Sequence, residues 1–160
     1  MRANHSPQTV CQRPQSRTTN ASIENVMNKS GKIHNSKANL TRRIEGGTAT
    51  DSGVIYAVRC KKHDLISVGY TTMPLNERMN CHRYKIGNRP EACELTQHFA
   101  QNGCDFSRDV EISILKHVTG SADRMELEED KWISYLNTKA PFGMNERLSE
   151  YGKIYKKLFG

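Results

Sequence analysis

The stretch VIYAVRCKKHDLISVGYT, residues 54–71, decides the fold of this chain. Its two apolar runs, VIYAVRC and LISVGY, are rich in the β-branched and aromatic residues that favour strands. The polar KKHD between the runs is a tight connection. The stretch therefore predicts two adjacent strands joined as a β-hairpin.

The segment after the hairpin, PLNERMNCHRYKI at residues 74–86, has the features of a helix. Thr72 can cap this helix, and Pro74 suits its first turn. Its predicted apolar face consists of Leu75, Met79, His82 and Ile86. Arg78 lies on the flank of that face, one turn before His82.

Arg78 and His82 are expected to project together from this helix. A guanidinium fork is the preferred side chain for binding a phosphate, and an imidazole can accept or donate a proton near neutral pH. The pair is therefore a candidate phosphate site. A solvated surface arginine and a core histidine bonded to a backbone carbonyl are the alternatives.

The remaining elements complete a small mixed fold. After a break at residues 87–90, residues 91–102 predict a second helix and residues 110–118 alternate as a third strand. Ser121 caps a third helix, which stops before Pro141. This order predicts an α+β fold in which helices pack on a small three-stranded sheet.

Glu129 stands in the middle of the apolar stripe of that last helix. At about 100° per residue, the stripe consists of Met125, Glu129, Trp132, Ile133 and Leu136. The residues expected to point elsewhere are Glu126, Asp130 and Lys131. A carboxylate on a core-facing stripe costs several kcal/mol unless it is paired or binds a metal. Glu129 is therefore a candidate cation ligand, with an arginine ion pair or a place near solvent as the alternatives.

Residues 1–48 differ in composition from the rest. They are rich in Ser, Thr, Asn and Gln, carry scattered Arg and Lys, and contain only Glu24 and Glu45 as acids. Because such composition is typical of disorder, we expect a disordered basic arm here and a folded domain at residues 49–160. The end of that domain, residues 141–160, predicts a turn and a short basic helix.

The charge of the chain limits its partners. The formal charge of +7 and the pI ≈ 9.3 favour a polyanionic partner, for which nucleic acid is the natural candidate. No stretch of the sequence is apolar enough to span a bilayer or to act as a signal segment. We expect an intracellular, nuclear protein that binds DNA and no membrane.

The chain has five cysteines and no paired CxxC motif. An odd number fits reduced thiols rather than a secreted disulfide scaffold. Cys60-x-x-His63 could begin a zinc site with His82, His98 or Cys104 as a further ligand. Because no second close pair completes it, the sequence leaves zinc binding open.

Several separated motifs together resemble the GIY-YIG endonuclease domain, from about residue 53 to residue 145. They are VIY (54–56), SVGYT (67–71), Arg78, His82, Glu129-x-x-Trp132-Ile133 and Pro141-x-Gly143-x-Asn145. The later motifs are most similar to the endonuclease domain of Penelope-like retroelement reverse transcriptases. The resemblance implies a central antiparallel sheet, hydrolysis of DNA phosphodiester bonds with one Mg²⁺ or Mn²⁺, and a reverse transcriptase as a possible partner or fusion.

The resemblance also implies a role for each matching residue. Tyr56 would lie near the attacking water, Arg78 would contact the scissile phosphate, and His82 would help move the proton. Glu129 would bind the metal, Asn145 would orient the site, and Gly69 would permit close backbone approach. These groups should then share one basin, with the Glu129 carboxylate facing Arg78 and Tyr56.

Ser67 departs from the family pattern, because it replaces the tyrosine of the second triplet. A serine hydroxyl cannot reach as far as a phenol or fill its volume. Tyr70 does not replace it, since a residue three places along a strand faces the opposite side. The alternative function is therefore a nucleic-acid-binding module that keeps the fold with weakened or lost catalysis.

Overall fold

The computed structural model describes residues 23–146 and residue 158. Residues 1–22 of the predicted arm, and nearly all of the predicted basic C-terminal helix, lie outside them. Within the described residues, no helix is long and apolar enough to cross a membrane.

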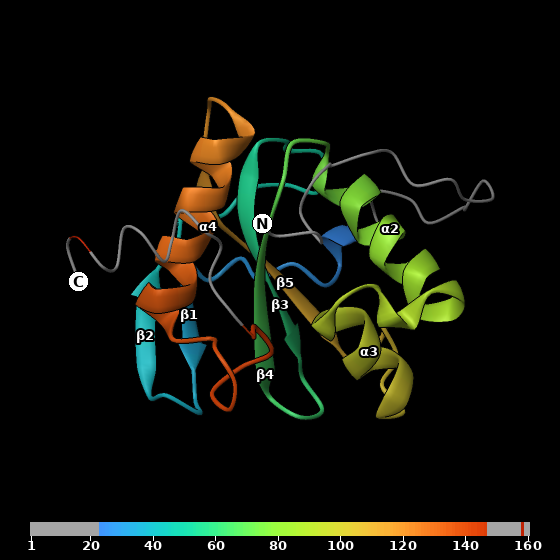
Figure 1. The fold of residues 1–160 in the computed structure, drawn as a ribbon. Coiled ribbons are helices and arrows are strands. Elements are labelled where there is room, and N and C mark those ends of the chain that lie inside the picture. The colour runs from blue at the N-terminus through green and yellow to red at the C-terminus, as the bar shows by residue number, and fades with distance from the viewer. Residues whose placement is uncertain (1–22, 147–157, 159–160) are drawn as a thin grey trace.

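The described chain forms an α+β fold with two antiparallel sheets (Figure 1). The strands are β1 (Lys32–Asn35), β2 (Leu40–Arg43), β3 (Val54–Cys60), β4 (Leu65–Thr71) and β5 (Val110–His117). The helices are α2 (Leu75–Asn88), the short 3₁₀ helix η1 (Pro90–Ala92), α3 (Glu94–Gln101) and α4 (Ala122–Leu136). The predicted class, the hairpin at residues 54–71 and the order of the elements after it are confirmed.

The central sheet has the strand order β4-β3-β5, and helices cover both of its faces (Figure 1). Alternation along β3 sends Tyr56 and Val58 into an apolar cluster with Leu75 and Met79 of α2. The residue between them, Ala57, belongs to a second cluster, which includes Met125, Ile133 and Leu136 of α4. Helices α2 and α3 therefore lie on one face of the sheet and α4 on the other.

The expectation of a disordered arm over residues 1–48 is wrong for its described part. Strands β1 and β2 pair as a hairpin, and Ile33 of β1 is buried in the α4 cluster. Ile23 and Met27 are buried in the α2 cluster. A few well-placed apolar side chains hold this polar segment on the domain, although its average composition resembles that of a disordered chain.

Neighbouring chain segments cover both edges of the central sheet. On the β5 edge, Glu45 N donates to Leu115 O at 3.1 Å, and Met27 forms a bridge with Ile112. On the β4 edge, Met144 N donates to Ile66 O at 2.8 Å. Covered edges satisfy backbone groups that would otherwise pair with another chain.

The start of α2 depends on residues before the hairpin and not on the predicted Thr72 cap. No side chain caps this helix. Instead, Leu75 N donates to Asp51 O at 2.9 Å and Asn76 N donates to Ala49 O at 2.8 Å. Two of the free N–H groups at the helix start are thereby satisfied. The segment around Ala49 thus fixes the helix that carries Arg78.

Both ends of α4 have side-chain caps. Ser121 accepts a hydrogen bond from Arg124 N, as predicted. At the other end, the buried Asn35 of β1 donates from Nδ2 to Leu136 O at 2.9 Å and to Asn137 O at 3.0 Å. The β1–β2 hairpin therefore stabilises the C-terminus of α4, where free carbonyl groups need donors.

Candidate active site and a candidate metal centre

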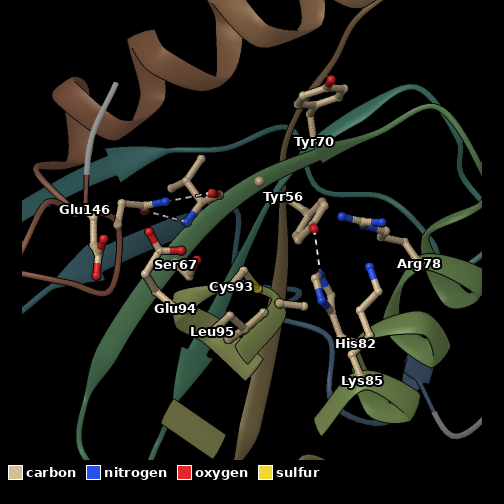
Figure 2. Close-up of a pocket in the computed structure, with 14 residues that line it drawn as sticks. Tyr56, Ser67, Tyr70, Arg78, His82, Lys85, Cys93, Glu94, Leu95 and Glu146 are labelled. Carbon is tan, nitrogen blue, oxygen red and sulfur yellow. Dashed lines mark hydrogen bonds between the residues drawn. The ribbon is translucent and has the colours of Figure 1, made fainter. Parts of the chain in front are cut away.

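A pocket opens at the β4 edge, between the central sheet, α2 and the start of α3 (Figure 2). The loop after α4 closes one side of it. The predicted site residues that line this pocket are Tyr56, Ser67, Gly69, Arg78, His82 and Asn145. The fold therefore gathers six of the seven predicted residues from four separate parts of the chain, and Glu129 is the exception.

Gly69 makes room for the Tyr56 ring. The two residues are direct partners across β3 and β4. A Cβ atom at Gly69 would stand 2.7 Å from the Tyr56 hydroxyl oxygen and 2.8 Å from Cζ, which is closer than real contacts allow. Because Gly69 has no side chain, the Tyr56 ring can lie directly against the Gly69 backbone. The close approach that this glycine permits is therefore the approach of the Tyr56 ring.

Tyr56 and His82 form a buried pair at the base of the pocket (Figure 2). The Tyr56 hydroxyl lies 2.9 Å from His82 Nε2. Burial raises the pKa of the Tyr56 phenol above its ordinary value, and the neighbouring Arg78 guanidinium only partly offsets this. The phenol is thus protonated at neutral pH and lies within hydrogen-bond distance of the imidazole, where the His82 tautomer decides which of the two groups donates.

Arg78 is a buried cation directed into the pocket. Only 8% of the residue is exposed, and its buried Nε has no hydrogen-bond partner among the described residues. Lys85 lines the pocket two turns further along α2. Burial, together with the nearby Arg78 charge, lowers the pKa of Lys85. Because a buried cation is costly without a counter-charge, this wall favours an anion.

Asn145 fastens the loop after α4 to β4. Its Oδ1 accepts from Val68 N at 2.9 Å and from Thr138 Oγ1 at 2.7 Å, and its Nδ2 donates to Val68 O at 3.0 Å. Gly143 allows this approach, since a Cβ there would stand 2.7 Å from Ile66 O. Asn145 therefore positions the pocket wall, and both ends of its amide are already engaged.

Ser67 and Tyr70 lie as the alternation of β4 predicts. Ser67 is half-buried on the Tyr56 side of the sheet, whereas Tyr70 is buried in the α4 cluster and only borders the pocket at the strand edge. Tyr70 does not take the place that a tyrosine at position 67 would occupy. The volume of a second phenol is therefore missing from this pocket wall.

The structure does not bring Glu129 into this pocket. Its residue exposure is 0%, and α4 packs on the opposite sheet face from α2. Asp130, which the helical phase directs away from the apolar stripe, is also buried. The carboxylates that do line the pocket are those of Glu94, at the start of α3, and Glu146, after Asn145 (Figure 2).

A second cluster of chemically active side chains lies at the other end of α3. Cys60 and His63 flank the start of the β3–β4 turn, His98 lies in the last turn of α3, and Cys104 follows that helix. The four potential ligand atoms all lie within 4.8 Å of one another. Cys60 and Cys104 are free thiols. Burial and the neighbouring Cys60 raise the pKa of the Cys104 thiol to about 11.

The spacing of this cluster fits a tetrahedral ion. Ligands about 2.0–2.3 Å from a central zinc stand about 3.3–3.8 Å from one another. Cys60 Sγ lies 3.4 Å from Cys104 Sγ and 3.5 Å from His63 Nδ1. Cys104 Sγ lies 3.2 Å from His63 Nδ1 and 3.8 Å from His98 Nε2, so the four distances are close to this range. Of the further ligands considered from sequence, His98 and Cys104 join Cys60 and His63, whereas His82 faces Tyr56 instead.

No protein-family model, curated protein or solved structure matches this chain.

Proposed function

We propose that this protein is an endonuclease that hydrolyses DNA phosphodiester bonds in the pocket between β4, α2 and α3. The observation that carries the proposal is the buried Arg78, whose Nε has no partner among the described residues and which lies beside the Tyr56–His82 pair. The motif order that resembles GIY-YIG nucleases supports the same reaction.

Arg78 would bind the scissile phosphate. A phosphodiester transition state spreads negative charge over its oxygens, and a fixed guanidinium in a site that excludes water stabilises that charge. Lys85, on the same wall, would hold a neighbouring phosphate of the strand. The substrate class is therefore a polynucleotide rather than a single small phosphate.

Tyr56 and His82 would move the proton of the attacking water. With Nε2 unprotonated, the phenol would donate to His82 Nε2, 2.9 Å away, so its oxygen could take a proton from water as it passes its own to the imidazole. Acting alone, Tyr56 would be a poor base, because burial raises its pKa. His82 is therefore the final proton acceptor in this scheme.

A divalent ion such as Mg²⁺ or Mn²⁺ would add electrostatic stabilisation to the phosphate oxygens. The fully buried Glu129, outside the pocket, does not fit the role of its ligand. A hard cation that keeps several waters needs only one or two carboxylates. Glu94 and Glu146, which line the pocket, would supply that donor set.

A plasmid-nicking assay with added Mg²⁺ or Mn²⁺ tests the proposal. Arg78→Gln should reduce nicking about 100-fold or more, because one fixed transition-state donor is lost. Arg108→Gln removes the same charge at an exposed site paired with Asp109 and should leave nicking unchanged. No nicking by the wild type with any divalent ion would contradict the proposal.

The two places for the metal ligand predict different variant effects. If the ion is held in the pocket, Glu94→Gln should weaken the dependence of nicking on Mg²⁺ concentration. Glu129→Gln should then chiefly lower the melting temperature. If a fully folded Glu129→Gln protein loses nicking and Glu94→Gln does not, the result would assign the metal ligand to Glu129 of α4 and not to the pocket.

The second candidate is a nucleic-acid-binding module that does not cleave. The buried Glu129 and the serine at position 67 favour it. It predicts salt-sensitive binding of duplex DNA without turnover. Under this alternative, Ser67→Tyr would restore some nicking, whereas efficient nicking by the wild type would exclude it.

We also propose that Cys60, His63, His98 and Cys104 bind a structural zinc ion. Two thiolates and two imidazoles are a common closed ligand set for zinc. The ion would tie the β3–β4 turn to the end of α3, and its binding energy would contribute to folding. It is a site separate from the pocket, since none of its ligands lines the pocket.

Metal analysis of protein purified without added zinc tests this site. The wild type should retain a single zinc ion, and Cys104→Ser should lose it together with part of the thermal stability. Cys93→Ser, at the remaining free cysteine of the described residues, should retain the ion. A zinc-free wild type that melts unchanged in the presence of a chelator, or one with a Cys60–Cys104 disulfide, would contradict the proposal.

A further inference from the structure

The β1–β2 hairpin presents a basic surface that the pocket does not use. Figure 1 shows the hairpin beside α4, away from α2 and α3. Its segment, residues 28–44, contains no Asp or Glu. Its cations are Lys29, Lys32, Lys37, Arg42 and Arg43.

These cations differ in their surroundings. Lys29 pairs with Glu24 at 2.9 Å. The Arg42 guanidinium lies 3.9 Å from the centre of the Tyr135 ring, and its Nε donates to Tyr135 O at 2.8 Å. Lys32 and Arg43 are exposed, and neither has an ion-pair partner within the part of the chain that the structure describes.

Lys32 and Arg43 are also direct partners in the antiparallel ladder. Like charges placed opposite each other destabilise a strand pair. His34 follows on the same exposed face, opposite Thr41, with its Nδ1 2.7 Å from Thr41 Oγ1. An acidic partner would relieve this repulsion.

We propose that this basic hairpin face, formed by Lys32, His34 and Arg43, binds the phosphate backbone of duplex DNA. A two-stranded antiparallel ribbon is narrow enough to enter a major groove, and its cations would displace counterions from the phosphates. The inference rests on the proposed action on DNA and adds a contact remote from the reacting phosphate. The pocket then cleaves, while the hairpin face contributes affinity.

Binding of a duplex oligonucleotide, measured at several salt concentrations, tests the hairpin face. In the full chain, the double variant Lys32→Gln/Arg43→Gln should reduce the slope of log K against log salt by about 1.8. If the two contacts contribute nothing to affinity at 1 M salt, a slope difference of about 1.8 means that the double variant binds DNA about 30-fold more weakly than the wild type at 0.15 M salt. An unchanged slope would overturn the inference.

Arg108→Gln/Arg124→Gln is the matched control. It removes two exposed positive charges, one beyond α3 and one in the first turn of α4, and should leave the salt slope unchanged. A slope that falls equally in both double variants would assign the effect to net charge and overturn the inference.

Thermal melting separates a binding role from a structural one. Because the Lys32→Gln/Arg43→Gln change removes a like-charge pair, the melting temperature should stay the same or rise while DNA affinity falls. A lower melting temperature with unchanged DNA affinity would overturn the inference. So would loss of binding to phosphatidylserine vesicles with no loss of binding to DNA.

The nicking assay distinguishes this inference from the proposed function. At saturating DNA, the hairpin variant should nick at the wild-type rate, and only the DNA concentration needed for half-maximal rate should rise. A protein that never nicks DNA would refute the proposed function, yet the salt slope would still decide the role of the hairpin face.

Discussion

The hydroxyl of Tyr56 occupies the space directly over the backbone of Gly69. An added Cβ at Gly69 would meet that oxygen at 2.7 Å, and the same oxygen lies 2.9 Å from His82 Nε2. A glycine on one strand thereby determines where the phenol of the next strand stands, and hence whether the phenol reaches the imidazole.

Gly69→Ala should displace the Tyr56 ring and break its bond to His82. Overpacking of this kind costs about 1–3 kcal/mol of folding free energy. Nicking should fall by more than the fraction of unfolded protein explains. The control is Gly87→Ala in α2, where an added Cβ meets no atom within 4 Å. That variant should gain about 0.5–1 kcal/mol in stability. Denaturant unfolding measures the stability of the two variants, and nicking assays measure their activity.

Tyr56→Phe should remove the proton relay and keep the ring. The expected loss in nicking rate is about 10²–10⁴-fold, with about 1 kcal/mol of stability lost with the hydrogen bond. Tyr84→Phe, on the half-buried flank of α2, is the control and should change neither. Equal nicking by Tyr56→Phe and wild type would exclude the phenol from the reaction.

His117 should make stability depend on pH. Its Nε2 lies 2.8 Å from Asp51 and its Nδ1 lies 2.7 Å from Glu45. The Asp51 and Glu45 hydrogen bonds raise the pKa of His117 above 6.5. Hydrogen bonds from His117 lower the pKa of Asp51 below 3.8 and, against the opposing effect of burial, that of Glu45 below 4.5.

The signs of these pKa shifts define a pH window. The raised His117 pKa stabilises the fold fully below pH 6.5, and this contribution is lost as pH rises through the folded-state pKa. The lowered carboxyl pKa values stabilise the fold above about pH 4.5, and this is lost on acidification. The stability difference between wild type and His117→Gln should therefore peak near pH 5–6 and shrink as the pH rises further above 6.5. A difference that stays constant with pH would contradict this.

Asn145→Ala should release the loop after α4 from β4. Three hydrogen bonds are lost, two of which involve the backbone of Val68. Leaving those groups unsatisfied costs about 1–3 kcal/mol. Hydrogen exchange of the Val68 amide should accelerate in this variant, and nicking should fall because the pocket wall moves. Asn102→Ala, which removes an exposed side-chain bond to His98 at the end of α3, should leave that amide unchanged.

The central sheet and its helices are predictable because their sequence periods are strong. The alternation of residues 110–118 and the apolar runs of residues 54–71 match β5, β3 and β4 closely. The β1–β2 hairpin is not predictable in this way, because its strands contribute only isolated apolar residues such as Ile33. Its stability depends on long-range contacts, including the bonds from Asn35 to the end of α4.

The candidate site was predictable where its residues lie on strands or helices whose sequence shows clearly which face is buried. Tyr56 and Arg78 share the pocket because β3 and α2 have the expected faces. Glu129 shows the limit of that reasoning, since phase predicts burial correctly but not which side of the sheet the helix covers. For the Cys/His cluster, the sequence indicates Cys60 and His63 as a possible start. It does not decide which of His82, His98 and Cys104 joins them, because those residues are far away in the sequence.

The segments that cover the β4 and β5 edges of the central sheet also determine how short a folded fragment of this chain can be. A fragment limited to residues 53–145 would strip β5 of the main-chain partners contributed by Met27 and Glu45 and would remove Ile23 from the apolar layer. Bare strand edges promote self-association. The smallest well-behaved fragment for biochemical work must therefore begin at or before Ile23, well upstream of the start of β3 at Val54.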